Sequence, residues 1–372
     1  MKFLDLQQQQ KRIRSSLERR LSDILDHGAY IMGPEVLELE ERLANYCGVK
    51  HAISCSSGTD ALLIPLMAWN IGPGDAVFTT PFTYVATAEV ISLLGATPVF
   101  VDVYDSTFNI DCEKLEIAIQ KTIADGIMNP KAIIPVDLFG VPARYRLIDK
   151  IAKKYNLKVI EDAAQSFGGS IGDQKVGSFG DAAATSFYPA KPLGCYGDGG
   201  AIFTNDNELA EKCRAIRIHG TSSDKYNSEL IGLNGRLDTI QAAVLLEKLT
   251  IFDNELKLRN QVSKTYKKYF NNSQYIPKNY HSAHAIFSVT LGSYKKREQL
   301  IRKLNENSIP NVVYYQYPIH LMKGFEYLGY KKGDFLVSEN LSQTIVSLPM
   351  HPYLLSLDIE EIVQVINKKE IE

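Results

Sequence analysis

The chain has 372 residues and carries 41 Lys and Arg against 43 Asp and Glu, so its formal net charge is −2. This balance supplies no basic field for nucleic acid or anionic lipid, and we expect neither kind of partner. The opening stretch MKFLDLQQQQKRIRSSLERR lacks the apolar core of a signal peptide, and no stretch approaches the ~20 apolar residues that span a membrane. We therefore expect a cytoplasmic protein.

The five cysteines form no CxxC pair, which predicts neither a disulfide framework nor a zinc site. Free cysteines behave as small apolar side chains, so we expect all five to be buried. They are Cys47, Cys55, Cys112, Cys195 and Cys213.

Residues 1–25 are expected to form an N-terminal arm and helix, with QQQQ at 7–10 on its solvated face. A second amphipathic helix is predicted from Pro34, which suits a first helical turn, to Gly48, a natural stop. Short apolar runs then alternate with helical stretches, which predicts an α/β fold with a doubly wound, mostly parallel sheet. The predicted strands are 51–55, 76–80, 97–103, 131–139, 157–162, 183–188 and 199–205.

A long helical pattern over 236–270 is expected to join two domains. We place a large domain at 26–250 and a smaller α+β domain at 251–372. Pro65 conflicts with the helix predicted around it, where proline would cost ~3 kcal/mol or shift the register.

Each of two strand ends allows either a purely structural interpretation or a ligand-binding one. In SSGTDALL, Ser57, Gly58 and Thr59 lead straight into a helix, which suits either an ordinary N-cap or a phosphate site. In TTPFTYVATAE, Phe82 and Tyr84 suit either core packing or stacking on a flat ligand. Neither stretch decides the matter alone.

Two further strand ends bring charged groups to the same edge. EDAAQSFGG places Asp162 and Gln165 where a buried strand ends, and TSFYPAKPLGCYGDGG places Ser186 at a strand end with Lys191 on the turn that follows. A buried carboxylate needs a positive partner. An anion cradle, an aromatic ring, a carboxylate and an amine are the set that pyridoxal phosphate requires.

These motifs, together with GPEVLELEERLANYCGVKHAISC, GATPVFVDV and GLNGRLDTIQAAVL, resemble the DegT/DnrJ/EryC1/StrS family of sugar-nucleotide aminotransferases over nearly the whole chain. SLPMHPYL and the stretch around Lys191 look closest to the branch that acts on 3-keto UDP-N-acetylhexosamines and 3-keto uronic acids. The resemblance implies the fold-type-I architecture of aspartate aminotransferase. Family members with His in place of the lysine are dehydratases, so Lys191 favours transamination.

The resemblance also implies residue roles. Lys191 would carry the cofactor and shuttle the proton, and Asp162 would hold the ring nitrogen. Gln165 would contact the ring hydroxyl and Tyr84 would stack on the ring. Ser57, Gly58, Thr59 and Ser186 would hold the phosphate, and Tyr315 and His320 would contact substrate.

In this family a dimer partner completes the site through an NSRL stretch, which reads Asn234, Gly235, Arg236 and Leu237 here. Asn234 is then a phosphate contact and Arg236 a substrate contact of the neighbouring subunit. The Ser-to-Gly departure at 235 is expected to loosen this loop.

The expected activity is transfer of an amino group from L-glutamate, which leaves as 2-oxoglutarate, to the C3 ketone of a UDP-linked N-acetyl sugar, with pyridoxamine phosphate formed during turnover. Such 3-amino sugars would enter lipopolysaccharide or other surface glycans. A C4-keto UDP or dTDP sugar and a non-catalytic sugar-nucleotide sensor remain alternatives. An amino-acid aminotransferase would need a carboxylate-binding arginine, for which Arg302 is available.

Overall fold

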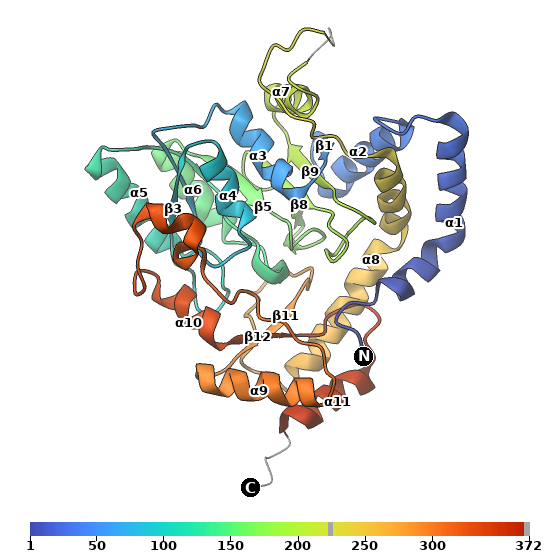
Figure 1. The fold of residues 1–372 in the computed structure, drawn as a ribbon, viewed down its shortest axis with the longest axis vertical. Helices are drawn as coiled ribbons and strands as arrows, with labels where there is room; N and C mark the ends of the chain where they lie inside the picture. Colours follow the sequence, from blue (N-terminus) through green and yellow to red (C-terminus); the bar gives the residue numbers. More distant parts are fainter. Residues whose placement is uncertain (222–225, 368–372) are drawn as a thin grey trace.

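A seven-stranded sheet forms the centre of the computed structural model, which describes residues 1–221 and 226–367 (Figure 1). The strand order is β1-β9-β8-β5-β4-β2-β3, and only β9 runs antiparallel to its neighbours in this sheet. The predicted mostly parallel, doubly wound sheet is therefore confirmed. The strands are β1 (His51–Cys55), β2 (Asp75–Thr79), β3 (Thr97–Phe100), β4 (Asn129–Ile133), β5 (Lys158–Asp162), β8 (Ala182–Ser186) and β9 (Gly200–Thr204).

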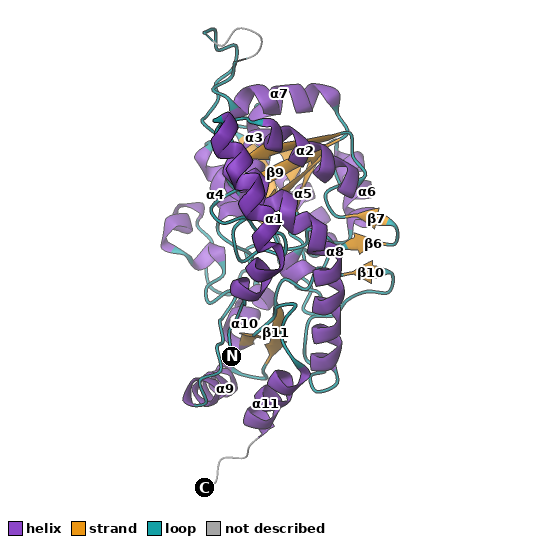
Figure 2. Cartoon of the chain, turned by 90° about the vertical axis from the view of Figure 1, so that its right-hand side faces the viewer, coloured by secondary structure: helices purple, strands orange, loops and turns teal. Residues whose placement is uncertain are grey.

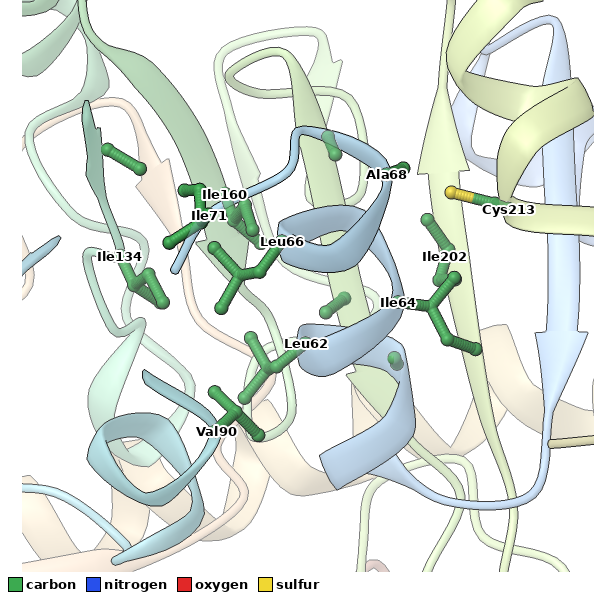
Figure 3. Close-up of a cluster of buried hydrophobic side chains, with 14 of the residues drawn as sticks. Leu62, Ile64, Leu66, Ala68, Ile71, Val90, Ile134, Ile160, Ile202 and Cys213 are labelled. Carbon is green, nitrogen blue, oxygen red and sulfur yellow. The ribbon is translucent and has the colours of Figure 1, made fainter. Parts of the chain in front are cut away.

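Helices cover both faces of the sheet, because successive strand residues point to opposite sides. Ile202 of β9 belongs to the cluster under α3 and α7, whereas Phe203 belongs to the cluster under α1, α2 and α8. Figure 3 shows Leu66 of α3 beside Ile160 of β5 and Leu62 beside Val90. Burying each such side chain contributes about 1.5–3 kcal/mol. These helices are α1 (Leu6–His27), α2 (Pro34–Cys47), α3 (Gly58–Ala68), α4 (Ala86–Leu93), α5 (Cys112–Asp125), α6 (Tyr145–Tyr155), α7 (Asn207–Arg217) and α8 (Thr239–Lys267).

Helix α3 runs through Pro65 without a break. Proline has no N–H, so the Ala61 carbonyl lacks its usual partner one turn later. Pro65 is nevertheless buried, and its helix neighbours Ile64 and Leu66 belong to the cluster that packs on the sheet. Tertiary packing therefore outweighs the local cost that the sequence predicts.

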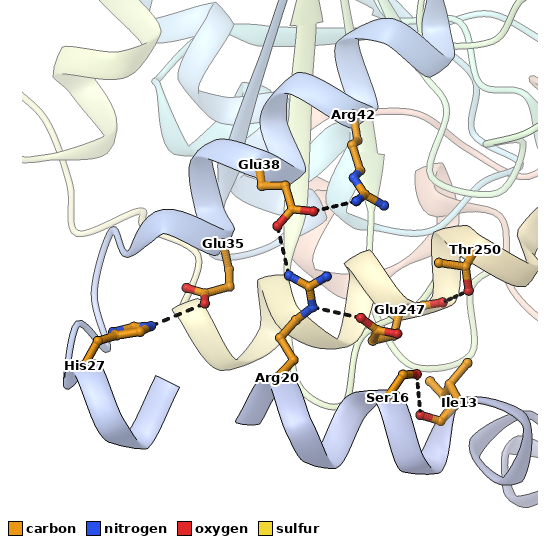
Figure 4. Close-up of polar contacts among 9 residues, drawn as sticks. All are labelled: Ile13, Ser16, Arg20, His27, Glu35, Glu38, Arg42, Glu247 and Thr250. Atoms are coloured by element: carbon orange, nitrogen blue, oxygen red, sulfur yellow. Dashed lines mark hydrogen bonds and ion pairs between the residues drawn. The ribbon is translucent and has the colours of Figure 1, made fainter. Parts of the chain in front are cut away.

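Helix α1 is held against α2 and α8 by apolar and ionic contacts (Figure 4). Arg20 bonds Glu38 at 2.9 Å and Glu247 at 2.8 Å. The expected solvated QQQQ face is wrong for Gln9, which is buried and donates to Glu255 at 2.7 Å. The Gln9 amide thus exchanges a hydrogen bond to water for one to a buried carboxylate on α8.

The second layer of the molecule lies at the far end of α8 (Figure 2). Strands β11 (Phe287–Thr290) and β12 (Ile345–Leu348) pair there, and helices α9 (Tyr294–Glu306), α10 (Leu336–Thr344) and α11 (Ser356–Asn367) pack around them. The division at 250/251 stays a prediction, since α8 continues through it. The remaining short elements are β6 (Ser170–Ile171), β7 (Gln174–Lys175), β10 (Tyr280–His281), η1 (Leu138–Gly140), η2 (Ile319–Leu321) and η3 (Lys323–Leu328).

All five cysteines are buried, as predicted. Within the described residues, no helix is both long and apolar enough to cross a membrane.

Candidate active site

A cavity of about 380 Å³ opens at the carboxyl edge of the sheet. Strand ends, the turn after β8 and segments from the second layer all contribute to its wall. Nine of the residues predicted for the site line it: Ser57, Gly58, Thr59, Tyr84, Asp162, Gln165, Ser186, Lys191 and Tyr315.

The turn between β1 and α3 packs directly on the end of β8. Ser57 caps α3 by accepting the Asp60 N–H at 3.0 Å, so the N-cap interpretation is confirmed. A Cβ atom at Gly58 would lie 2.6 Å from the Ser186 Cβ, which leaves room only for glycine. The backbone N–H groups of the first turn of α3 and the Ser186 hydroxyl thus form one small concave surface, which suits a phosphate.

Asp162 ends β5 inside the cavity. Thr87 donates its hydroxyl to Asp162 Oδ2 at 2.8 Å, and the Ala164 N–H donates to Oδ1 at 3.2 Å. Burial raises the pKa of Asp162, and the charge of Lys191 partly opposes this. A cationic ring placed against this carboxylate would add a counter-charge in direct contact with it.

Lys191 lies on the turn after β8, where its N–H donates to the Tyr188 carbonyl at 2.9 Å. Its side chain lines the cavity, as the glycine-rich context predicts. Burial lowers the pKa of the amine, while Asp162 acts in the opposite direction. A lowered pKa increases the share of neutral amine, the form that can attack a carbonyl or accept a proton.

Gln165 is fixed at both ends of its amide. Its Oε1 accepts the Phe139 N–H at 2.8 Å, and its Nε2 donates to the Tyr315 hydroxyl at 2.8 Å. Tyr315 is itself held by an edge contact with Phe82. These bonds give the amide and the phenol a defined orientation at the cavity wall.

The two aromatic residues of the second motif take different places. Phe82 is fully buried and packs against Phe108, which is the core packing weighed above. Tyr84 is 58% exposed and lines the cavity, so its ring is free to cover a flat ligand.

Glu161, next to Asp162 in β5, forms a buried acid pair with Asp137. Glu161 Oε2 accepts the Gly177 N–H at 3.0 Å and the Phe179 N–H at 3.1 Å, and its Oε1 has no hydrogen-bond partner among the described residues. Burial raises the pKa of both acids, and the charge of Asp137 raises that of Glu161 further. The pair therefore retains a proton where exposed acids are ionised.

Asn234 and Arg236 do not line the cavity of their own chain. Arg236 Nε donates to Asn234 Oδ1 at 2.9 Å on the loop before α8. The backbone of Gly235 is held at both polar groups: its carbonyl accepts the Ser56 N–H at 3.0 Å and its N–H donates to the Arg217 carbonyl at 2.9 Å, while the loosening expected from the loss of serine stays a prediction. The loop is thus fixed beside the β1–α3 turn, with Asn234 exposed and Arg236 half-buried.

His320 is not brought to the cavity wall. Its side chain is buried, bonds Glu339 at 3.1 Å and packs on the edge of Phe335. It is not among the cavity-lining residues, and its contact with substrate stays a prediction. Arg302 does not line the cavity either, and it is exposed on α9.

The sequence analysis did not single out the other lining residues, among them Thr87, Phe3 and Leu4. Thr87 follows Tyr84 by three residues on the first turn of α4, and this helical spacing could have placed its hydroxyl at the same edge. Phe3 and Leu4 precede α1, and no periodicity or motif marks them.

Comparison with known proteins identifies the relatives of this chain. Residues 11–367 match the DegT/DnrJ/EryC1/StrS aminotransferase family. A UDP-2-acetamido-2-deoxy-3-oxo-D-glucuronate aminotransferase from Pseudomonas aeruginosa is 45% identical, with 95% of this chain and 96% of that protein aligned. A protein described as a pleiotropic regulatory protein, from Geobacillus stearothermophilus, is 42% identical, with 95% and 94% aligned. The crystal structure of a family aminotransferase from Brucella abortus superposes with a TM-score of 0.95 and 48% identity over 98% of both chains.

Proposed function

Because the chain belongs to the DegT/DnrJ/EryC1/StrS aminotransferase family, we propose that it transfers the amino group of L-glutamate to the C3 ketone of a UDP-linked N-acetyl keto sugar. One observation carries the proposal: Asp162 and Lys191 face the same cavity as the β1–α3 turn. The chain is a pyridoxal-phosphate-dependent aminotransferase, and the proposal concerns its two substrates. It would act in the cytoplasm and feed lipopolysaccharide or another surface glycan.

The residues of the cavity fit pyridoxal phosphate. Asp162 would hold the ring nitrogen, Gln165 would lie at the ring hydroxyl, and Tyr84 would cover the ring face. Ser57, Gly58, Thr59 and Ser186 would hold the phosphate. When bound, pyridoxal phosphate supplies an electron sink that stabilises negative charge on the reacting carbon.

Within this arrangement each side chain of the protein has a separate task. Lys191 Nζ would carry the cofactor between turnovers and move the proton at the substrate carbon during them. Asp162 would keep the ring nitrogen protonated, and Thr87 fixes one of its carboxylate oxygens at 2.8 Å. The fixed geometry lets these groups act without reorganisation.

The C3 ketone and the UDP group are proposed from the Pseudomonas aeruginosa relative, whose name specifies a 3-oxo UDP sugar. The identity of 45% extends over 95% of this chain. A C4-keto UDP or dTDP sugar is the competing substrate.

The test is product analysis with purified holoenzyme, glutamate and a panel of UDP-keto sugars, each made in the same vessel by its dehydrogenase or dehydratase. We expect release of 2-oxoglutarate and a 3-amino sugar, identified by mass spectrometry and NMR. A 4-amino product would overturn the C3 assignment, and an amino donor other than glutamate would overturn the donor.

A regulatory role is the second candidate, since the Geobacillus stearothermophilus relative is described as a regulator. A protein that only senses sugar nucleotides would release no 2-oxoglutarate when mixed with glutamate. An amino-acid aminotransferase is disfavoured, because among the described residues no arginine of the second layer lines the cavity.

We propose that the enzyme is a homodimer with shared sites. Lys191 is the only cation among the described residues that line the cavity, yet a cofactor phosphate and a sugar-nucleotide diphosphate must both be bound. In a two-fold dimer each subunit would lend Asn234 and Arg236 to the other site, because such an interface is reciprocal. Arg236 would offer a planar fork that lysine cannot replace.

Mixing Lys191→Ala protein with Arg236→Ala protein tests this arrangement. Each variant alone should be inactive, whereas hybrid dimers should contain one intact site. With full subunit exchange, half of the dimers are hybrids, and each hybrid has one intact site out of its two. About a quarter of wild-type activity should therefore return. Differently tagged subunits verify the exchange, and a mixture that exchanges yet stays inactive would place Arg236 in the site of its own chain.

A further inference from the structure

The segment before α1 reaches the active-site cavity. Phe3 and Leu4 are half-buried and both line it. In Figures 1 and 2 this end of the chain lies beside α8 and the β11–β12 sheet. The N-terminal segment therefore forms part of the cavity wall on the side of the second layer.

The backbone of this segment is anchored on both sides of the two residues. The Phe3 carbonyl accepts the Met350 N–H at 3.3 Å. Asp5 caps α1 by accepting the Gln8 N–H at 3.2 Å. Lys2 bonds Asp5 at 3.1 Å. These contacts fix where the Phe3 and Leu4 side chains enter the cavity.

A buried arginine ties the same region to another part of the wall. Arg259 of α8 donates to the carbonyls of Met350, at 3.3 Å, and His284, at 3.2 Å. His284 precedes Ala285 and Ile286, which also line the cavity. The N-terminal segment and residues 284–286 thus contribute to one wall through a common support.

This wall is apolar. Its side chains come from Phe3, Leu4, Ala285 and Ile286. Phe3 and Leu4 join none of the hydrophobic clusters of the described fold, so no cluster covers their apolar surface. A diphosphate placed against them would lose its hydration without gaining a cation. Uncharged C–H and methyl groups would gain from the same contact.

We infer that Phe3 and Leu4 contact the sugar of the substrate, at its ring C–H face and acetamido methyl group, and favour N-acetylated sugars. The inference rests on the proposed function. It gives Phe3 and Leu4 a part in substrate specificity, whereas Asp162 and Lys191 would carry out the reaction.

Steady-state kinetics of Phe3→Ala and Leu4→Ala test the inference, with Leu25→Ala as the control. Leu25 lies on α1 and is 66% exposed. For the acetamido keto sugar, KM should rise about tenfold in each test variant while kcat changes by less than about threefold. The reason is that the lost apolar contact weakens binding of the substrate and of the transition state equally. Phe3→Leu should retain most of the affinity, and a keto sugar without the acetyl group should show a smaller rise in KM.

The outcomes separate this inference from the proposed function. If the wild type aminates the sugar and both alanine variants keep its KM, the inference is wrong and the function stands. If the variants alter the dimer on gel filtration without changing KM, the wall is a subunit contact, which also overturns the inference. If the wild type aminates no keto sugar, the proposed function fails first and the inference falls with it.

Discussion

Replacing Lys191 by alanine is expected to lower the amination rate by about 10⁴-fold, the upper range for loss of a positioned acid or base. The variant should fold normally, because Lys191 makes no side-chain hydrogen bond or ion pair among the described residues and is not part of a hydrophobic cluster. The measurement is release of 2-oxoglutarate from glutamate and amino sugar from the keto sugar, with thermal unfolding as the check on folding.

Lys153→Ala is the matched control, since Lys153 is exposed on α6 away from the cavity. Borohydride reduction of the wild-type holoenzyme followed by peptide mapping should find the pyridoxyl group on Lys191. An adduct on another lysine would refute the assignment.

Replacing Asp162 by asparagine is expected to lower the rate by about 10²- to 10⁴-fold, because asparagine keeps the shape but not the charge that holds the ring nitrogen protonated. The same substitution is expected not to lower stability. Burial raises the pKa of Asp162 in the protein without cofactor, so the folded state holds this proton more tightly than the unfolded state does. The ionisation of Asp162 therefore destabilises the folded state as pH rises through the folded pKa. At pH 7 the cofactor-free variant should therefore be at least as stable as the cofactor-free wild type.

Thermal unfolding of both cofactor-free proteins at pH 7 and near pH 4 checks this sign. The advantage of the variant should shrink at the lower pH, which lies close to the ordinary aspartate pKa of 3.8, so that the carboxyl of the unfolded wild type is only about half ionised. Asp173→Asn, at an exposed turn, is the control. A variant with wild-type turnover, or one less stable at pH 7 than at pH 4 relative to wild type, would contradict the role given to Asp162.

Strand ends were the most informative part of the sequence. A parallel sheet gathers the carboxyl ends of its strands at one edge, so Ser57, Asp162 and Ser186 could be placed together without long-range information. The antiparallel direction of β9 was not predicted, although its signal is present. No helix separates β8 from β9, and a parallel pair would need such a crossover.

What the sequence did not predict depends on tertiary partners. The burial of Gln9 depends on its bond to Glu255, 246 residues away, and the position of His320 outside the cavity wall depends on its contacts with Glu339 and Phe335. Thr87 reaches Asp162 across 75 residues. Periodicity reports which face of an element is apolar, and it carries no information on which distant group will satisfy one polar side chain.

The buried acids Asp137 and Glu161 make folding a reaction that takes up a proton. In the unfolded chain both carboxyl groups ionise near their ordinary pKa values, whereas in the folded chain burial raises both. At neutral pH this pair therefore contributes less negative charge to the folded protein than the −2 counted from its sequence assumes. The heat of folding then includes the ionisation heat of the buffer that supplies the proton. Because the folded state binds this extra proton, rising pH shifts the equilibrium toward the unfolded chain.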